Sequence, residues 1–303
     1  MNPAAALLQF VDAHAPVLVL TGAGLSTGSG IPAYRNARGE WTRPAPVTHQ
    51  NFLRSALVRR RYWARSMHGW PAFAAAQPNA GHRALVALAQ RGRLGGLVTQ
   101  NVDGLHERAG SVGVIAMHGR LARVVCLDCS AWFARAEIQE RLVQMNPQWR
   151  EPSGAPIAQP PVGQQRADPQ PLALLQALAA GADGDVQPAD VALTTLDLAR
   201  VEVPACSACG GVLKPDVVMY GDGVPAQRVL AIDKLLADCR GMLVVGSSMS
   251  AFSGYRICRA ARARGLPVAA LTLGWTRADA LLTLKLDADC VAALASAARL
   301  ARG

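Results

Sequence analysis

Four of the seven cysteines form two closely spaced pairs, Cys126 with Cys129 and Cys206 with Cys209. Each pair has the C-x-x-C spacing, which presents two thiolates from one turn to the same tetrahedral ion. Four protein ligands leave no open coordination position, so the pattern predicts one structural zinc rather than a catalytic one. Thiol–disulfide redox chemistry is the alternative, and the presence of two such pairs disfavours it.

Small and polar residues follow the ends of short apolar runs, which we expect to be buried parallel strands. These runs cover residues 16–21, 94–99, 112–116, 241–246 and 267–273. The segments between them carry helical patterns, at residues 80–92, 226–238 and 253–264. The alternation predicts an α/β fold, with a doubly wound parallel sheet and helices on both faces. Ligands bind such sheets at the carboxyl ends of the strands, where these small and polar residues lie.

The first run ends in a glycine turn, Gly22-Ala23-Gly24-Leu25-Ser26-Thr27. Such a turn after a strand lets backbone amides and a helix N-terminus approach a pyrophosphate. The usual dinucleotide fingerprint has a third glycine where Thr27 stands, so the turn alone fits an ordinary tight turn equally well. The next segment, GSGIPAYR at 28–35, favours a mobile lid with a cation directed at phosphate or ribose, and a structural loop is the alternative.

Two further strand ends carry groups suited to chemistry. Gln100, Asn101 and Asp103 can bind a carboxamide and ribose hydroxyls, and they can also cap a helix. His118 ends the third run, and histidine is the side chain that most readily takes a proton near neutral pH. A purely structural histidine is the alternative there. We interpret His106 as a helix-packing residue.

The strand pattern is interrupted twice. Residues 42–80 are rich in Arg, Trp and Pro, and we expect a helical insertion over the nucleotide site. Residues 121–211 contain the paired cysteines and a Pro/Gln-rich stretch from Pro147 to Pro171, which indicates a smaller zinc-binding module with an irregular connection. The main domain would then comprise residues 1–120 and 212–303. Residues 214–222 could pair with an extended peptide, or form a plain strand.

Composition restricts the partners. The formal net charge of +10 favours anionic partners, although a solvated Arg-rich surface explains it equally well. The basic run Arg59-Arg60-Arg61 lacks interleaved aromatic residues, so we expect no specific nucleic-acid partner. The early apolar run is too short to cross a membrane, and residues 1–15 lack a signal peptide's basic start. We therefore expect a cytoplasmic protein with no membrane partner.

The ordered set of motifs resembles the sirtuin family. The match comprises GAGLSTGSGIPAYR at 22–35, TQNVDGLH at 99–106, HG at 118–119, both cysteine pairs, KPDVVMYGD at 214–222 and GSS at 246–248. The long insert between the cysteine pairs, with residues 61–65 and 69–71, resembles the class II branch, which includes bacterial enzymes and a mitochondrial one.

The resemblance implies a Rossmann-like domain and an NAD-dependent protein-lysine deacetylase or deacylase. Such an enzyme consumes NAD, acts on acyl-lysine proteins, and yields deacylated lysine, nicotinamide and O-acyl-ADP-ribose. Its implied catalytic residues are His118, as general base on the ribose hydroxyls, with Asn101 and Asp103 at the nicotinamide. The implied NAD-binding residues are Gly22, Ala23, Gly24, Ser26, Pro32, Tyr34, Arg35, Trp41, Gln100, Asn101, Asp103, Gly246, Ser247, Ser248, Leu273, Gly274 and Cys290. The implied peptide clamp consists of Val218, Tyr220, Gly221 and Asp222.

Three places depart from the family pattern. Ala33 replaces an aspartate, Met219-Tyr220 replaces a phenylalanine pair, and Thr272 replaces an asparagine. Tyr62 and Arg65 have the YxxR spacing that recognises acidic acyl chains in another sirtuin branch. Arg65 would then pair with an acyl carboxylate, or it is a structural residue of the helical insertion.

Two other functions are compatible with parts of the sequence. One is a protein mono-ADP-ribosyltransferase that uses the same NAD cleft. The other is a basic zinc module that binds nucleic acid, which would leave the polar strand ends without a purpose. Thr27 and the closed zinc site disfavour a hydride-transferring dehydrogenase.

Overall fold

The computed structural model describes residues 2–36, 38, 40, 46–149 and 200–301. The chain divides into two compact units. The first comprises Met1–Thr42, Ala76–Arg120 and Val224–Gly303, and the second comprises Arg43–Ala75 and Leu121–Gly223. Trp41 and most of the Pro/Gln-rich stretch lie outside the described residues. Among the described helices, none is long and apolar enough to cross a membrane.

The first unit is built on a six-stranded sheet with the strand order β3-β2-β1-β7-β8-β9. The strands are β1 (Val17–Thr21), β2 (Leu94–Thr99), β3 (Ile115–Ala116), β7 (Gly241–Val245), β8 (Val268–Leu271) and β9 (Leu284–Leu286). All neighbouring strands pair in parallel. The order reverses between β1 and β7, which is the switch point of a doubly wound sheet. The predicted α/β fold class is confirmed.

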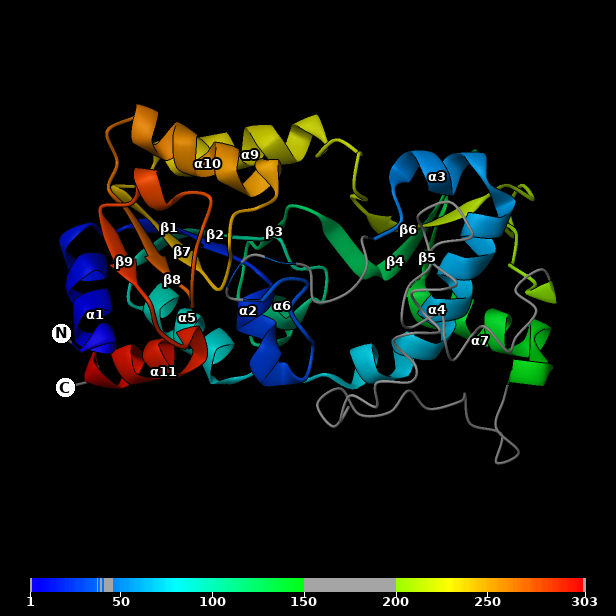
Figure 1. The fold of residues 1–303 in the computed structure, drawn as a ribbon, viewed down its shortest axis with the longest axis horizontal. Helices are drawn as coiled ribbons and strands as arrows, with labels where there is room; N and C mark the ends of the chain where they lie inside the picture. The colour runs from blue at the N-terminus through cyan, green and yellow to red at the C-terminus, as the bar shows by residue number, and fades with distance from the viewer. Residues whose placement is uncertain (1, 37, 39, 41–45, 150–199, 302–303) are drawn as a thin grey trace. The chain divides into compact units, whose positions relative to one another are not determined.

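Helices cover both faces of this sheet. Figure 1 shows α9 (Ala226–Ala237) and α10 (Phe252–Ala263) on one side of the strands, and α1 (Pro3–Ala13), α5 (Ala80–Gln90) and α11 (Cys290–Leu300) on the other. In β1, Val17 and Val19 belong to one hydrophobic core, whereas Leu18 and Leu20 belong to the other. Because successive side chains point to opposite faces, a strand buried on both faces is apolar throughout. This explains why the central strands could be predicted.

Two parts of the first unit were not predicted. The edge strand β9 contains Lys285, and two of its three residues are only partly buried, so its sequence lacks the apolar signature of the central strands. Helices α1 and α11 fall in alanine-rich segments at the two ends of the chain. The predicted third strand is shorter than expected, since residues 112–114 are not part of β3.

The second unit combines helices with a three-stranded sheet of order β5-β4-β6. Its elements are α3 (His49–Arg54), α4 (Ala56–Ala75), β4 (Gly119–Cys126, which begins in the first unit), β5 (Trp132–Ala134), α7 (Arg135–Met145), η2 (Pro147–Trp149) and β6 (Leu213–Val217). Strands β4 and β5 are antiparallel. The hydrophobic core includes Trp63, Val124, Ile138 and Leu213.

The grouping of α3 and α4 differs from the division predicted from the sequence, which places residues 42–80 in the nucleotide-binding domain. Residues Arg43–Ala75 instead cluster with the cysteine-bearing unit. The reason is packing, since Trp63 of α4 is fully buried in that unit's core. Its indole Nε1–H donates to the Leu213 carbonyl at 3.3 Å.

A buried arginine joins α7 to α4. The Arg135 guanidinium lies over the rings of Trp63 and Trp70, with Cζ at 5.5 and 4.9 Å from the ring centroids. Its Nη2 donates to the carbonyl and hydroxyl oxygens of Ser66, at 3.0 and 2.9 Å. Burial lowers the pKa of Arg135 to about 10, so the side chain is still charged at neutral pH. Among the described residues, no carboxylate forms an ion pair with it.

Candidate active site and metal centre

Two glycine turns meet at the switch point of the sheet. The backbone N–H of Gly22 donates to Val245, and that of Gly24 donates to Gly246, at 2.9 and 2.8 Å. A Cβ on Gly22 would lie 2.6 Å from Cβ of Ser247, and one on Gly24 would lie 2.9 Å from the Gly246 oxygen. Gly246 itself has φ +58°, a conformation that favours glycine. All three glycines are therefore required by the close approach of the two backbones.

Gln100 spans the carboxyl ends of β2, β1 and β7. Its backbone N–H donates to the Thr21 carbonyl at 3.0 Å, and its side-chain Nε2 donates to Ser247 Oγ at 2.8 Å. Gly254 leaves room for this side chain, because a Cβ there would lie 2.8 Å from Gln100 Oε1. Ser248 Oγ lies 2.9 Å from Ser250 Oγ. The structure thus brings the predicted residues of both halves of the sheet to one edge.

Asn101, Ser26 and Asp103 form one hydrogen-bonded group. The Asn101 amide donates to the Gly22 carbonyl and to Ser26 Oγ, both at 3.0 Å, and Ser26 Oγ donates to Asp103 Oδ2 at 2.7 Å. Asp103 Oδ1 accepts the Leu105 N–H at 2.9 Å at the start of helix α6 (Leu105–Arg108). Both interpretations of Asp103 are therefore compatible, because it accepts the first N–H of this helix, whose N-cap residue is Gly104, and also orders the polar group. Burial raises the pKa of Asp103, and the hydrogen bond from Leu105 opposes that shift.

His118 is held from both sides of its ring. Nδ1 lies 2.9 Å from the Gln100 carbonyl oxygen, which only accepts, so the neutral ring carries its proton on Nδ1. Nε2 then offers its lone pair, and Ser253 Oγ lies 2.9 Å from it. Burial lowers the pKa of His118, the bond to Gln100 opposes the shift, and the charge of Arg228 adds to it. The result is a neutral imidazole with an accepting Nε2 at neutral pH.

Ser253 was missed by sequence reasoning. It lies in the first turn of α10, outside every motif, and only the fold brings its hydroxyl to His118. The one available signal was a small polar residue shortly after a strand end that already carried two serines.

Other predicted NAD residues are spread more widely. Cys290 begins α11, and its Sγ donates to the Gly24 carbonyl at 3.5 Å, so it lies at the glycine turn. Leu273 is 55% exposed after β8, and the N–H of Gly274 donates to Asp287 Oδ1 at 3.0 Å. The remaining predicted residues with described side chains are Ala23, Pro32 and Arg35, which are partly buried, and Tyr34, which is 53% exposed.

The predicted peptide-binding segment lies in the second unit, beyond β6. The N–H of His49 donates to the Tyr220 carbonyl at 2.8 Å, and Gln50 Nε2 donates to the Gly221 carbonyl at 2.8 Å. Asp222 Oδ2 lies 3.5 Å from His49 Nδ1. The start of α3 therefore fixes this segment. Val218 is partly buried, whereas Tyr220 is 44% exposed.

Tyr62 and Arg65 occupy successive turns of α4 in the second unit. The Tyr62 ring packs edge-on against Phe52 and Trp63, with ring centroids 5.5 Å apart in both cases. Arg65 is partly buried, and its guanidinium makes no hydrogen bond or ion pair with any residue that the structure describes. Tyr62 is therefore anchored, whereas the Arg65 cation has no protein anion to neutralise it within the described part.

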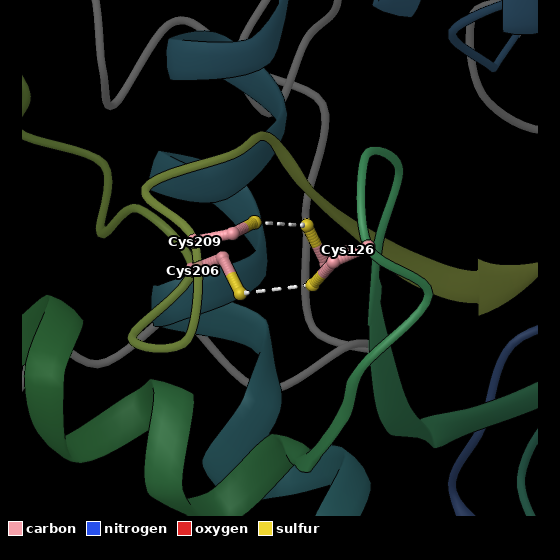
Figure 2. A group of neighbouring side chains, drawn as sticks. Cys126, Cys206 and Cys209 are labelled. Carbon is pink, nitrogen blue, oxygen red and sulfur yellow. Dashed lines mark hydrogen bonds between the residues drawn. The ribbon is translucent and has the colours of Figure 1, made fainter.

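The four predicted metal ligands converge in the second unit. Cys126 Sγ lies 3.5 Å from Cys209 Sγ, Cys129 Sγ lies 3.7 Å from Cys206 Sγ, and all four sulfur atoms lie within 4.8 Å of one another. Figure 2 shows the sulfurs of Cys206 and Cys209 directed toward the turn that carries Cys126. Tetrahedral zinc with Zn–S bonds of about 2.3 Å requires sulfurs about 3.8 Å apart. The four-cysteine cluster therefore fits a structural zinc.

Asp128 links the two cysteine turns through hydrogen bonds. Its Oδ2 accepts the N–H of Val212 at 2.8 Å, and its own N–H approaches Cys126 Sγ at 3.4 Å. Gly211 permits this contact, since a Cβ there would lie 2.1 Å from Asp128 Oδ2. Hydrogen bonds from outside the ligand set commonly orient metal ligands in this way.

Replacing Cys126 by serine (Cys126→Ser) should release zinc and destabilise the second unit, because the binding free energy of a structural zinc contributes directly to folding. Elemental analysis of the purified protein and its thermal unfolding would measure both effects. Cys239→Ala is the matched control, since Cys239 is a buried thiol of the first unit. Full zinc content in Cys126→Ser would contradict the assignment of the metal ligands.

Comparison with known proteins agrees with this geometry. The Sir2 family model matches residues 22–253. An NAD-dependent protein deacetylase of Xanthomonas campestris pv. campestris (strain 8004) is 47% identical over 290 residues, which is 96% of this chain and 89% of that protein. The NAD-dependent protein lipoamidase sirtuin-4, mitochondrial, of Bos taurus is 42% identical over 287 residues, which is 94% of this chain and 82% of that protein.

Solved structures share the fold. One of them, a Sir2 structure with a p53 peptide and NAD+, is 22% identical with a TM-score of 0.69, over 98% of this chain and 96% of that chain. The family match covers both glycine turns, His118 and all four paired cysteines. The chain belongs to the Sir2 family, the sirtuins.

Proposed function

We propose that this protein is an NAD-dependent protein-lysine deacetylase or deacylase, which yields deacylated lysine, nicotinamide and O-acyl-ADP-ribose. The observation that carries the proposal is His118, a partly buried histidine whose Nδ1–H donates to the Gln100 carbonyl at 2.9 Å. A base of this kind lies at the sheet edge where the glycine turns and the Asn101 group also meet. The names of the relatives, deacetylase and lipoamidase, agree with this proposal.

The Asn101 group is suited to hold the nicotinamide end of NAD. Both N–H bonds of the Asn101 amide are used internally, on Gly22 and Ser26, so the orientation of the side chain is fixed. Its Oδ1 atom is then presented as an acceptor for a carboxamide N–H. Asp103 is held by Ser26 and Leu105 and supplies a second acceptor. A bound carboxamide would thus meet pre-oriented groups, which reduces the entropy lost on binding.

His118 would remove a proton from a ribose hydroxyl through Nε2. That atom faces Ser253 Oγ in this structure, so a hydroxyl placed there finds a lone pair already directed at it. The Gln100 carbonyl accepts a hydrogen bond from Nδ1–H. This bond stabilises the imidazolium that forms when Nε2 takes up the proton. Gln100 also bonds Ser247, and we assign Gly246, Ser247 and Ser248 to the ribose and phosphate side.

The second unit would supply the substrate clamp and a structural metal. The segment Val218–Asp222 is held by α3 and presents Tyr220, which suits pairing with an extended acyl-lysine peptide. Zinc on four cysteines has no open position, so it would stabilise this unit without entering the reaction. We also retain as predictions the class II branch, a cytoplasmic location and the lack of a specific nucleic-acid partner.

Nicotinamide release from NAD should require an acyl-lysine peptide and should be abolished by His118→Tyr, because the base is lost. Formation of O-acyl-ADP-ribose, followed by mass spectrometry, distinguishes deacylation from ADP-ribosyl transfer through the same cleft. His14→Gln is the control for replacing a histidine, since His14 ends α1 outside the site. Nicotinamide release without any need for an acyl peptide, from folded and zinc-loaded protein, would favour the transferase.

Replacing Arg228 by glutamine should move the acid limb of the pH profile of kcat/KM to higher pH. The wild-type limb should lie below the ordinary histidine pKa of about 6.5, since burial and Arg228 lower the pKa of His118. Removing the positive charge makes protonation of His118 easier, so its pKa rises toward the ordinary value. Arg264→Gln, an exposed change in the same unit, should leave the profile unchanged. A downward shift in Arg228→Gln would contradict the role of His118 as the titrating base.

We further propose that Arg65 selects acyl chains that end in a carboxylate. Arg65→Ala should lower kcat/KM on glutaryl-type peptides about tenfold, the effect of losing about 1.4 kcal/mol, and leave acetyl and lipoyl peptides unchanged. Arg61→Ala on the same helix is the matched control, since Arg61 is also a partly buried arginine. Equal processing of all three peptides before and after the Arg65 change would show that this residue is purely structural.

A further inference from the structure

A line of buried polar side chains lies behind the candidate active site in the first unit, and none of them has been given a role in binding or catalysis. Its members are almost completely enclosed: Thr21 0%, Asn79 9%, His82 0%, Thr99 4% and His106 1% exposed. Buried polar groups are costly unless they are hydrogen-bonded, so the partners of each atom define what the line can do.

One end of the line reaches Asn101. The backbone N–H of Asn101 donates to Thr99 Oγ1 at 3.0 Å, and Thr21 Oγ1 donates to the same oxygen at 2.9 Å. Thr21 Oγ1 also lies 2.8 Å from His106 Nε2. Because the Thr21 proton is committed to Thr99, the Thr21 oxygen must accept at this contact. Neutral His106 therefore carries its proton on Nε2 and leaves Nδ1 as an acceptor.

The other end of the line reaches the glycine turn. The Asn79 side-chain Nδ2 donates to the Leu25 carbonyl at 2.7 Å and to Ser29 Oγ at 3.0 Å. The Asn79 backbone N–H donates to His82 Nδ1 at 3.4 Å, as part of the capping box of α5. Since His82 Nδ1 accepts, the proton of neutral His82 lies on Nε2.

The rings of His82 and His106 are neighbours, and each has one ring nitrogen without a described partner. Their ring centroids are 4.9 Å apart, with the planes inclined at 60°. His82 Nε2 and His106 Nδ1 are both buried, and neither has a hydrogen-bond partner among the described residues. The tautomers derived from the two ends make the first atom a donor and the second an acceptor. A buried donor and a buried acceptor on adjacent rings can be joined by one buried water.

We infer that the Thr99, Thr21, His106 and His82 side chains, continued by the Asn79 backbone N–H, form one directional hydrogen-bond chain, closed between His82 Nε2 as donor and His106 Nδ1 as acceptor, which acts as a positioning network for Asn101 and the glycine turn. Its consequence for turnover rests on the proposed function. The pKa values agree with the neutral rings that the chain requires. Burial and the nearby Arg83 lower the pKa of His82 to about 4, and burial and His82 lower that of His106 to about 3.

The tautomers of the two histidines test the chain independently of activity. Nitrogen-15 NMR of the full-length zinc-loaded protein at neutral pH should show His82 and His106 as neutral rings protonated on Nε2, with His82→Gln and His106→Gln assigning the signals. A proton on Nδ1 of either ring, or a doubly protonated ring, would overturn the inference.

The positioning role is tested by Thr21→Val, which removes the hydroxyl that links His106 to Thr99. We expect kcat for nicotinamide release to fall about tenfold, because Asn101 loses its support, with KM for the acyl peptide unchanged. Thr21→Ser should restore kcat. The control is Thr283→Val, whose hydroxyl bonds the Val268 carbonyl at the opposite end of the strands.

An unchanged kcat in Thr21→Val would refute the positioning role. A wild-type protein without peptide-dependent turnover would instead refute the proposed function, and the NMR tautomers would still decide whether the chain exists.

Discussion

The contact between the turns after β1 and β7 is the constraint on which the rest of the site depends. Gly22 and Gly24 approach Gly246 and Ser247 so closely that a single added Cβ would collide with the opposite turn. This contact brings the two halves of the sheet together at the switch point. It also sets the position of the Gly22 carbonyl, which in turn accepts from Asn101. The close packing of the two backbones thereby determines how the Asn101 amide is oriented.

Hydrogen bonds connect that contact to the other polar side chains of the site. Ser26 links Asn101 to Asp103, and Gln100 links Ser247 to the ring of His118 through its side chain and its carbonyl. Each group therefore has its orientation determined by a neighbour and not by solvent. Such preorganisation is what a site needs when its electrostatic groups must be aligned before the reaction begins.

Much of this arrangement could be predicted from the sequence because the central strands are buried on both faces. Runs such as residues 16–21 are then apolar throughout, and polar residues placed directly after them identify the ligand-binding edge. The four zinc ligands could also be predicted, because each C-x-x-C pair lies within a single turn and its spacing is visible in the local sequence. Edge strand β9 was not predicted, because it is short and contains Lys285.

Contacts made by single side chains from distant segments could not be predicted. The Ser253 hydroxyl reaches His118 across 135 positions of sequence, and Thr21 reaches His106 across 85. His106 is accordingly interpreted from the sequence as a packing residue, whereas in the fold its Nε2 lies 2.8 Å from Thr21 Oγ1. The grouping of α4 with the cysteine-bearing unit is a comparable case, since it depends on where Trp63 is buried.

The buried Arg135 has a consequence for how the second unit responds to its surroundings. Its guanidinium lies over the Trp63 and Trp70 rings. Unlike a carboxylate, an indole ring is not protonated in acid and carries no net charge that salt ions could screen. Carboxylate ion pairs weaken in acid and in salt, but the attraction between a guanidinium and an indole ring is largely indifferent to both. The packing of α7 on α4 through Arg135 should therefore keep its geometry when pH or ionic strength changes.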